Sequence, residues 1–253
     1  LVSFDLGNGF VKVVSSSGDS HFPSVYAMQE PGIDFEGLQQ ADDFVISFLG
    51  DTYAVGWSAW RMGNIPVRTL DRTRVLGPEY RVLFAAALSA SCNQGAVIEP
   101  VLSLPLSWYD RREQVKGHLA GDWQVTTKGR TMSFTVPEIL IRIIPEGFGS
   151  ICSMALDRNG RPHNNGLLHM TVGVVDIGTK TTDLSMFDGL QIVPARTAGF
   201  DIGLSQVYNI MARLAEREMG HSFSIEQLDE VLHGGQLWLG PTDITTQAIE
   251  WKH

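Results

Sequence analysis

Two short segments combine an acidic residue with glycines and a lysine, and they carry the side chains best suited to chemistry. In the first segment, Asp5 stands at the end of a predicted strand, Gly7, Asn8 and Gly9 follow as a turn, and Lys12 lies on the return strand. Glycines at such a turn leave backbone N–H groups pointing into an open concavity, where they bind phosphate oxygens, and the lysine adds a positive charge. An Asp-x-Gly hairpin is also common as a plain turn, so both interpretations stay open for this segment alone.

The second segment, residues 176–183, is more specific. It places the Asp176 carboxylate, Gly178, the hydroxyls of Thr179 and Thr181 and the Lys180 ammonium around one tight turn. Hydroxyls and backbone amides suit a β- or γ-phosphate, and Asp176 is suited to hold Mg²⁺ through water. Carboxylates that face a polyphosphate repel it unless a cation intervenes, so this composition implies Mg²⁺. Two such segments in one chain favour a phosphate clamp over two unrelated turns.

Between these segments, Glu146 lies in a Pro-Glu-Gly loop that follows a predicted buried strand. A carboxylate at this place could orient or deprotonate a water molecule that attacks a γ-phosphate, which contributes about 10²–10⁴ in rate. The alternative is an exposed loop glutamate without a chemical role. The two flanking segments favour the first interpretation.

The elements that must position these residues alternate between strands and helices. Apolar runs joined by short turns predict hairpins at 2–14, 44–56, 123–136 and 171–187, and buried strands at 97–104 and 139–144. Helical spacing predicts helices at 79–91, 110–119, 150–156 and 202–219, and Ser224 to Gln227 resembles a capping box that opens a further helix. This mixture predicts an α/β fold with mixed sheets. The most polar stretch, 157–166, predicts a boundary between a domain at 1–156 and a second at 157–253.

The composition limits the classes of function. The chain has 19 basic and 28 acidic residues and a net charge of −9, which argues against direct nucleic-acid binding. Its two cysteines, Cys92 and Cys152, lie far apart, and no histidine pair has the spacing of a helical metal site, so neither a disulfide framework nor a zinc site is expected. No apolar run reaches the roughly 18 residues of a membrane helix, and the first residues lack the basic region of a signal peptide. We therefore expect a soluble cytoplasmic protein that does not bind membranes.

Two Asp-x-Gly hairpins with a Pro-Glu loop between them resemble the nucleotide-binding segments of the actin-like ATPases, a superfamily that includes sugar kinases and heat-shock chaperone ATPases. The chain is most similar to the bacterial and archaeal actin-like proteins of the ParM/StbA type. The segments that carry the resemblance follow the order of the family: 2–9 with Lys12, 104–106, 144–147, 174–183 and 198–203. The resemblance implies a two-domain actin-like (ribonuclease H-like) fold with mixed β-sheets and flanking helices.

The resemblance also implies a role for each of the residues above. Asp5 would position the magnesium shell, Asp176 would hold a magnesium-bound water, and Glu146 would position the lytic water. In the first loop, Gly7 to Gly9 would wrap the phosphates and Lys12 would contact the β-phosphate region, and Gly178 to Thr181 would form the second phosphate loop. Gly199, expected at the start of the long helix, would approach the ribose.

The function implied by this resemblance is Mg²⁺-dependent hydrolysis of ATP or GTP between two domains. In the family this activity is coupled to filament polymerisation, often for plasmid or other DNA segregation or as a prokaryotic cytoskeleton. Self-association is therefore expected, with a DNA-bound adaptor protein as a further partner. Two alternatives stay open: a small-molecule kinase of the same fold, and a scaffold that binds nucleotide without hydrolysing it.

The chain departs from the family pattern at its C-terminal end. Such proteins end with a Gly-Gly-rich adenosine-binding turn and a helix that returns to the first domain, whereas Gly234-Gly235 comes early here and the sequence stops inside the predicted helix that follows. Either a C-terminal portion lies outside this chain or base recognition is incomplete. The sequence therefore leaves the choice between ATP and GTP open.

Overall fold

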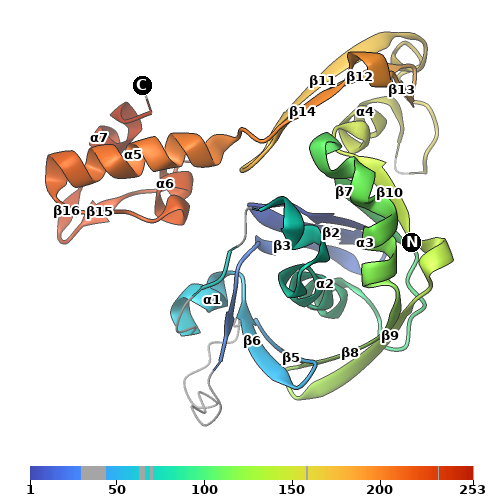
Figure 1. Ribbon diagram of the computed structural model, residues 1–253, viewed down its shortest axis with the longest axis horizontal. Coiled ribbons are helices and arrows are strands. Elements are labelled where there is room, and N and C mark those ends of the chain that lie inside the picture. The colour runs from blue at the N-terminus through green and yellow to red at the C-terminus, as the bar shows by residue number, and fades with distance from the viewer. Residues whose placement is uncertain (30–43, 63–65, 69–70, 158, 233, 253) are drawn as a thin grey trace. The chain divides into compact units, whose positions relative to one another are not determined.

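A computed structural model describes residues 1–29, 44–62, 66–68, 71–157, 159–232 and 234–252 of the chain (Figure 1). By their internal contacts they form two compact units, one comprising Leu1–Asp176 with Asp183–Gly199 and the other Ile177–Thr182 with Phe200–His253. The first is called unit 1 and the second unit 2. The domain boundary expected near residue 157 stays a prediction.

The first sheet of unit 1 brings the ends of three parallel strands to one edge. Its order is β10-β7-β1-β2-β3, from β10 (Arg142–Pro145), β7 (Pro100–Leu104), β1 (Val2–Leu6), β2 (Phe10–Ser15) and β3 (Gly18–Pro23). β7 is parallel to both β1 and β10, whereas β1 and β2 form an antiparallel hairpin in which Asp5 is opposite Lys12. The carboxyl ends of β1, β7 and β10 therefore lie together, and Glu146 directly follows β10.

The strands predicted at 97–104 and 139–144 correspond to β7 and β10, and both are shorter than predicted. β10 begins at Arg142 because the residues before it form a short 3₁₀ turn, η3 (Glu138–Leu140), where Ile139 is 92% exposed. Pro137 precedes this turn, and a proline cannot donate a ladder hydrogen bond. The apolar run at 139–144 therefore does not form a buried strand over its whole length.

A second sheet in unit 1 packs on the other side of a central helix (Figure 1). Its order is β4-β6-β5-β8-β9, from β4 (Tyr26–Met28), β6 (Asp51–Val55), β5 (Val45–Phe48), β8 (Gly121–Thr127) and β9 (Arg130–Val136). The helix α2 (Pro78–Ser91) contacts strands of both sheets, so it is apolar on nearly every face. Phe84 shows this arrangement, with ring centroids 4.9 Å from Phe4 of one sheet and 5.1 Å from Trp123 of the other.

Shorter elements complete unit 1. A third sheet, most of whose residues belong to unit 1, has the order β11-β12-β13, with β14 paired to β12. Its strands are β11 (Thr171–Ile177), β12 (Thr182–Asp188), β13 (Gln191–Ile192) and β14 (Ala198–Phe200). The helix predicted at 110–119 divides into a 3₁₀ turn and an α-helix. The remaining elements are α1 (Trp57–Met62), η1 (Arg72–Leu76), η2 (Leu106–Arg111), α3 (Arg112–Leu119), α4 (Phe148–Ala155), η4 (Leu167–His169) and η5 (Pro194–Arg196).

Unit 2 is built on α5 (Leu204–Met219), which buries Tyr208, Met211 and Ala215 at helical spacing in its own core. The other elements of this unit are α6 (Ile225–Leu232), β15 (Trp238–Leu239), β16 (Thr242–Asp243) and α7 (Thr245–Glu250). The predicted capping box is confirmed, because the Ser224 N–H donates to Gln227 Oε1 over 2.9 Å and the Gln227 N–H donates to Ser224 Oγ over 3.3 Å. The expectation that the sequence stops inside the last helix is wrong, since α7 ends at Glu250.

Candidate active site

Asp5 is held at the edge of the first sheet by two polar neighbours. Lys12 Nζ lies 3.4 Å from Asp5 Oδ2 across the hairpin, and Ser103 Oγ of β7 donates to Asp5 Oδ1 over 3.4 Å. Alternation along β1 explains this orientation: Phe4 and Leu6 point into the core, so Asp5 points to the opposite face. The sequence predicted Asp5 and Lys12 as site residues but missed Ser103, which lies next to Asp5 only because β7 pairs with β1.

Glu146 is half-buried beside other carboxyl groups. Its N–H donates to the Leu104 carbonyl over 2.9 Å, which fixes the loop to the end of β7. Burial, the nearby carboxylates of Asp5, Asp183 and Asp176, and a hydrogen bond with Asp183 together raise the pKa of Glu146 to about 9. The structure therefore brings the three predicted carboxylates, Asp5, Glu146 and Asp176, within electrostatic reach of one another in unit 1.

Asp183 is a member of this cluster to which the sequence pattern gave no role. It is fully buried, and its Oδ1 accepts a hydrogen bond from the Leu106 N–H over 2.9 Å. Burial of alternate residues along β12 places Asp183 on the same face as Ser185 and Phe187. A carboxylate on the apolar-facing side of a predicted strand was the signal that could have identified it, because buried charges are rare without a function or a partner.

Asp176, near the end of β11, also has a raised pKa. Burial and the charge of Asp5 raise the pKa of Asp176, whereas the charge of Lys12 lowers it. Asp176 thus responds to both members of the β1–β2 hairpin pair. At Asp176 the effects of burial and of the Asp5 charge exceed that of the Lys12 charge, so the net pKa shift is upward.

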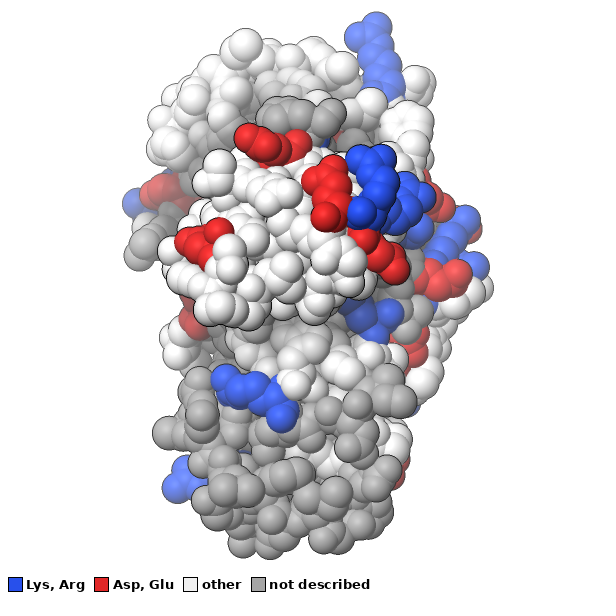
Figure 2. All heavy atoms as spheres, turned by 90° about the vertical axis from the view of Figure 1, so that its left-hand side faces the viewer, with Lys and Arg blue, Asp and Glu red and all other residues white. Residues whose placement is uncertain are grey.

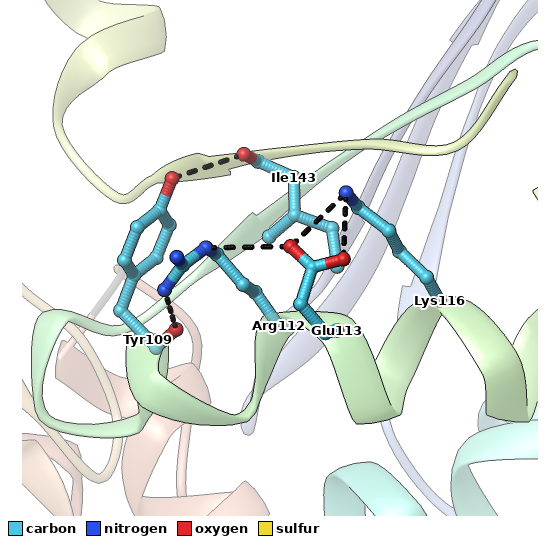
Figure 3. Close-up of polar contacts among 5 residues, drawn as sticks. All are labelled: Tyr109, Arg112, Glu113, Lys116 and Ile143. Carbon is cyan, nitrogen blue, oxygen red and sulfur yellow. Dashed lines mark hydrogen bonds and ion pairs between the residues drawn. The ribbon is translucent and has the colours of Figure 1, made fainter. Parts of the chain in front are cut away.

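The position of β10, and so of Glu146, is fixed by a contact from η2 (Figure 3). The Tyr109 hydroxyl donates to the Ile143 carbonyl over 3.1 Å. Arg112 lies over the Tyr109 ring, 5.1 Å from its centroid, and its Nη1 donates to the Tyr109 carbonyl over 3.3 Å. Glu113 and Lys116 form an exposed pair on the next turn, with 3.1 Å between Lys116 Nζ and Glu113 Oε2. Arg112 therefore holds Tyr109, the residue that contacts the strand before the site.

The carbonyl oxygens of the first loop are bound by side chains from other parts of unit 1. Ser24 Oγ donates to the Gly7 carbonyl, and Arg68 donates to the carbonyls of Asn8 and Gly9 at 3.2 and 3.3 Å. Arg74 Nη1 donates to the Leu6 carbonyl and to Asn8 Oδ1, each over 3.1 Å. None of these three side chains was predicted from the sequence.

This arrangement leaves the N–H side of the first loop available. Among the described residues, no hydrogen bond outside the strand ladders uses the N–H of Gly7, Asn8 or Gly9 as its donor. A Cβ at Gly7 would come within 3.0 Å of the Phe10 carbonyl oxygen, so the tight turn requires glycine there. The Asn8 side chain points to Arg74, so a phosphate contact from this residue would come from its backbone.

The second predicted loop lies in unit 2 and is bonded to the first turn of α5. The Gly178 N–H donates to the Thr181 carbonyl over 2.8 Å, which closes the turn. The Leu204 N–H donates to the Gly178 carbonyl over 3.1 Å, and the Ser205 N–H donates to the Thr179 carbonyl over 2.8 Å. Thr181 is buried and Lys180 is half-buried. The four residues predicted for this loop, Gly178 to Thr181, are therefore consecutive in one closed turn.

Gly199 is not at the start of the long helix, and that expectation is wrong. It lies in β14, and α5 begins only at Leu204. A Cβ at Gly199 would lie 2.6 Å from the Ser107 N and 2.7 Å from Asp183 Oδ1. This glycine therefore lets β14 pack closely against the buried carboxylate; its predicted contact with a ribose stays a prediction.

The described part of the chain contains neither a cluster of direct metal ligands nor a membrane-spanning helix. No group of three or more His, Cys, Asp or Glu side chains there is arranged to hold a metal ion. None of the described helices is long and apolar enough to cross a membrane. On the face drawn in Figure 2, the basic side chains of the described residues stand singly or beside acidic ones.

Unit 2 has a cavity of about 640 Å³ lined by residues of α5, β16 and α7. Glu218 and Trp251 lie in its wall, where Trp251 Nε1 donates to Glu218 Oε2 over 2.9 Å. This hydrogen bond, followed by one from Arg217, lowers the pKa of Glu218. None of the residues predicted for the site lines this cavity.

The mixed sheet in unit 1 and the Asp-x-Gly hairpins define an actin-like fold. Residues 3–149 match the family model for the N-terminal domain of actin-like proteins, and residues 174–249 match the model for the C-terminal domain of archaeal MreB-like actin homologues. The chain therefore belongs to the actin-like proteins, as its sequence predicted. A search of curated proteins found no significant match.

Solved structures confirm the fold. The crystal structure of Ta0583, an archaeal actin homologue, has a TM-score of 0.75 and 21% sequence identity, covering 98% of this chain and 77% of that one. Ta0583 in complex with ADP gives 0.73 and 20%, covering 99% and 77%. A 15-stranded ParM filament from Clostridium botulinum gives 0.75 and 21%, covering 99% and 79%.

Proposed function

We propose that this protein binds and hydrolyses ATP or GTP with Mg²⁺ and that the nucleotide controls its assembly into filaments. The observation that carries this proposal is the cluster of Asp5, Glu146 and Asp176, in which burial and the neighbouring carboxylates raise the pKa of Glu146 and Asp176. The carboxylates at this sheet edge suit a cation, and the N–H groups of the neighbouring loop, Gly7 to Gly9, suit an anion bound together with it.

The donor set fits Mg²⁺ held mainly through water. Mg²⁺ prefers oxygen ligands and keeps several waters, so one or two carboxylates together with phosphate oxygens suffice. Asp5 and Asp176 supply such oxygens. When bound, the ion would neutralise phosphate charge that these carboxylates otherwise repel.

The residues of the chain divide the remaining work. The N–H groups of Gly7 to Gly9, with Lys12, would hold phosphate oxygens at the first loop, and Gly178 to Thr181 would do so at the second. Glu146 would orient the water for in-line attack and accept its proton. Because burial and neighbouring carboxylates raise the pKa of Glu146, positive charge nearby is needed to leave it ionised at neutral pH.

The wider role follows from the family and from the assemblies of similar structures. One of the similar structures is a ParM filament and another is an archaeal actin homologue with ADP. These support a nucleotide-binding protein that polymerises. The cytoplasmic location and the role in plasmid or other DNA segregation, or as a cytoskeleton, are proposed from the resemblance of the sequence to the family. A head-to-tail contact that does not close would generate such a filament. Membrane attachment and direct nucleic-acid binding are not part of the proposal, and an adaptor protein would make the link to DNA.

The decisive experiment combines sedimentation with phosphate release. The purified chain is incubated with Mg²⁺ and ATP, GTP, ADP or no nucleotide, and the pelleted fraction and released phosphate are measured. Triphosphate-dependent pelleting with phosphate release supports the proposal. Phosphate transfer only after a sugar or acid is added would favour a kinase, and binding without release would favour a scaffold. No binding of either triphosphate would refute all three.

A further inference from the structure

Arg74, on the short turn η1, carries a buried charge that this function leaves unexplained. Arg74 is only 2% exposed, and its Nη1 donates to the Leu6 carbonyl and to Asn8 Oδ1, both 3.1 Å away. Its guanidinium carbon lies 5.6 Å from the centroid of the Tyr80 ring. Because Leu6 and Tyr80 are core residues, Arg74 reaches the first loop from the core side of the sheet, behind the turn.

This guanidinium carries a buried charge whose hydrogen-bond acceptors are neutral. Among the described residues, no carboxylate forms an ion pair with Arg74. Burial lowers the pKa of Arg74 and the neighbouring Arg68 lowers it further, whereas Tyr80, Glu79 and Asp5 raise it. An arginine nevertheless stays charged in proteins, so the charge remains and costs free energy at this place.

A purely structural role explains this arrangement poorly. Two neutral acceptors could be satisfied by a neutral donor, and burying a charge without a paired opposite charge is destabilising. Arg68 adds a second guanidinium to the same loop, bound to the carbonyls of Asn8 and Gly9. Two guanidinium groups thus bind the carbonyl oxygens at the first loop.

We propose that Arg74 is a positioning residue for the phosphate site: it fixes the carbonyl side of the first loop and supplies, from beneath, the charge that attracts the phosphates of the bound nucleotide. The anion on the loop adds to the counter-charge of Glu79 and Asp5, neither of which forms an ion pair with Arg74. This inference rests on the proposed nucleotide binding and extends it to a residue that does not touch the ligand. The ligand class is a nucleoside di- or triphosphate.

The effect on affinity is measurable. A unit charge that acts on a phosphate through the protein, at an effective dielectric constant of about 20, is expected to change the binding constant by about tenfold. Arg74→Gln removes the charge but keeps a hydrogen-bond donor, Arg74→Met removes both, and Arg74→Lys keeps the charge. Arg72→Met is the matched control, because Arg72 lies on the same turn but pairs with Asp110 at the surface.

The test measures Mg²⁺-dependent binding of ATP, ADP and AMP by titration calorimetry, with folding checked by circular dichroism. We expect the Gln and Met variants to lose about tenfold in affinity for ATP and ADP and less than threefold for AMP, the Lys variant to stay within threefold of wild type, and Arg72→Met to be unchanged. If Arg74 acted only through its hydrogen bonds to the loop, the Gln and Met variants would lose the same affinity for ATP, ADP and AMP. That result would overturn the proposal, and so would a Lys variant that binds as weakly as the Gln variant.

The controls separate this inference from the function on which it rests. Wild-type protein that binds none of the nucleotides refutes the proposed function itself. Wild-type protein that binds ATP, together with an Arg74→Gln variant of equal affinity, refutes only the role of Arg74. If neither neutral variant folds, the Lys variant tests the proposal. Because it keeps the charge, it should keep the wild-type preference for ATP over AMP, and loss of that preference would refute the role of Arg74.

Discussion

The backbone N–H of Leu106 donates a 2.9 Å hydrogen bond to Oδ1 of the buried Asp183. This contact joins the residue just beyond β7 to β12, two elements far apart in the sequence. Since β7 is paired with both β1 and β10, it also fixes Asp183 relative to Asp5 and Glu146. The acidic cluster is thus held by paired strands, and a rigid scaffold of this kind suits residues that must meet a ligand in one geometry.

Replacing Glu146 by glutamine should separate hydrolysis from binding. We expect phosphate release to fall by about 10²–10⁴ because the carboxylate that orients and deprotonates the water is lost. Nucleotide affinity should stay within a few-fold of wild type, as measured by titration calorimetry. Glu138→Gln, an exposed glutamate just before β10, is the control and should retain full activity. Unchanged phosphate release in the Glu146 variant would show that this residue is not the catalytic carboxylate.

Asp176→Ala should abolish the Mg²⁺ dependence of nucleotide binding. The substitution removes one of the carboxylate oxygens proposed to hold the magnesium-bound water. Calorimetric titrations with and without Mg²⁺ measure this dependence directly. Asp188→Ala, an exposed position at the other end of the same hairpin, should behave as wild type. Equal Mg²⁺-dependent affinity in the Asp176 variant and the wild type would contradict the assignment.

The pH dependence of stability provides a test on the protein without metal or nucleotide. The folded-state pKa of Glu146 is about 9, above its ordinary value of 4.5, so between these values the folded state keeps a proton that the unfolded state has lost. The free energy of unfolding should therefore fall as pH rises through this range, by at most about 1.4 kcal/mol per unit, and level off above it. Urea titrations at several pH values measure the slope. Glu146→Gln should lack this contribution and Glu138→Gln should keep it; identical slopes in all three proteins would contradict the raised pKa.

Gly199→Ala should destabilise the fold next to the site. An added Cβ would lie 2.6 Å from the Ser107 N and 2.7 Å from Asp183 Oδ1, so backbone or the buried carboxylate must move. We expect a loss of about 1–3 kcal/mol in the free energy of unfolding, measured by thermal or urea denaturation. Gly149→Ala in α4 is the matched control: its Cβ would meet nothing within 4 Å, and alanine favours the helix by about 0.5–1 kcal/mol. A Gly199 variant as stable as wild type would show that β14 is not tightly packed here.

Much of the fold was predictable because its signals are local in the sequence. The capping box at Ser224 and Gln227 lies within four consecutive residues, and its two hydrogen bonds form as predicted. The β1–β2 hairpin follows from alternation around a glycine turn, which places Asp5 opposite Lys12. Gly199 was misplaced because an apolar run before a helix does not show where the helix begins: β14 intervenes there.

The sequence by itself determined which chemical groups the protein carries and on which short segments they stand: the acidic turns, the glycines that allow them, and the glutamate after a buried strand. Only the tertiary structure decided how these groups act on one another. The raised pKa of Glu146, the participation of Asp183 and Ser103, and the buried charge of Arg74 behind Asn8 all come from elements paired across long stretches of chain. Electrostatic interaction and desolvation depend on distance in space, and distance along the chain does not fix that distance until the strands have paired.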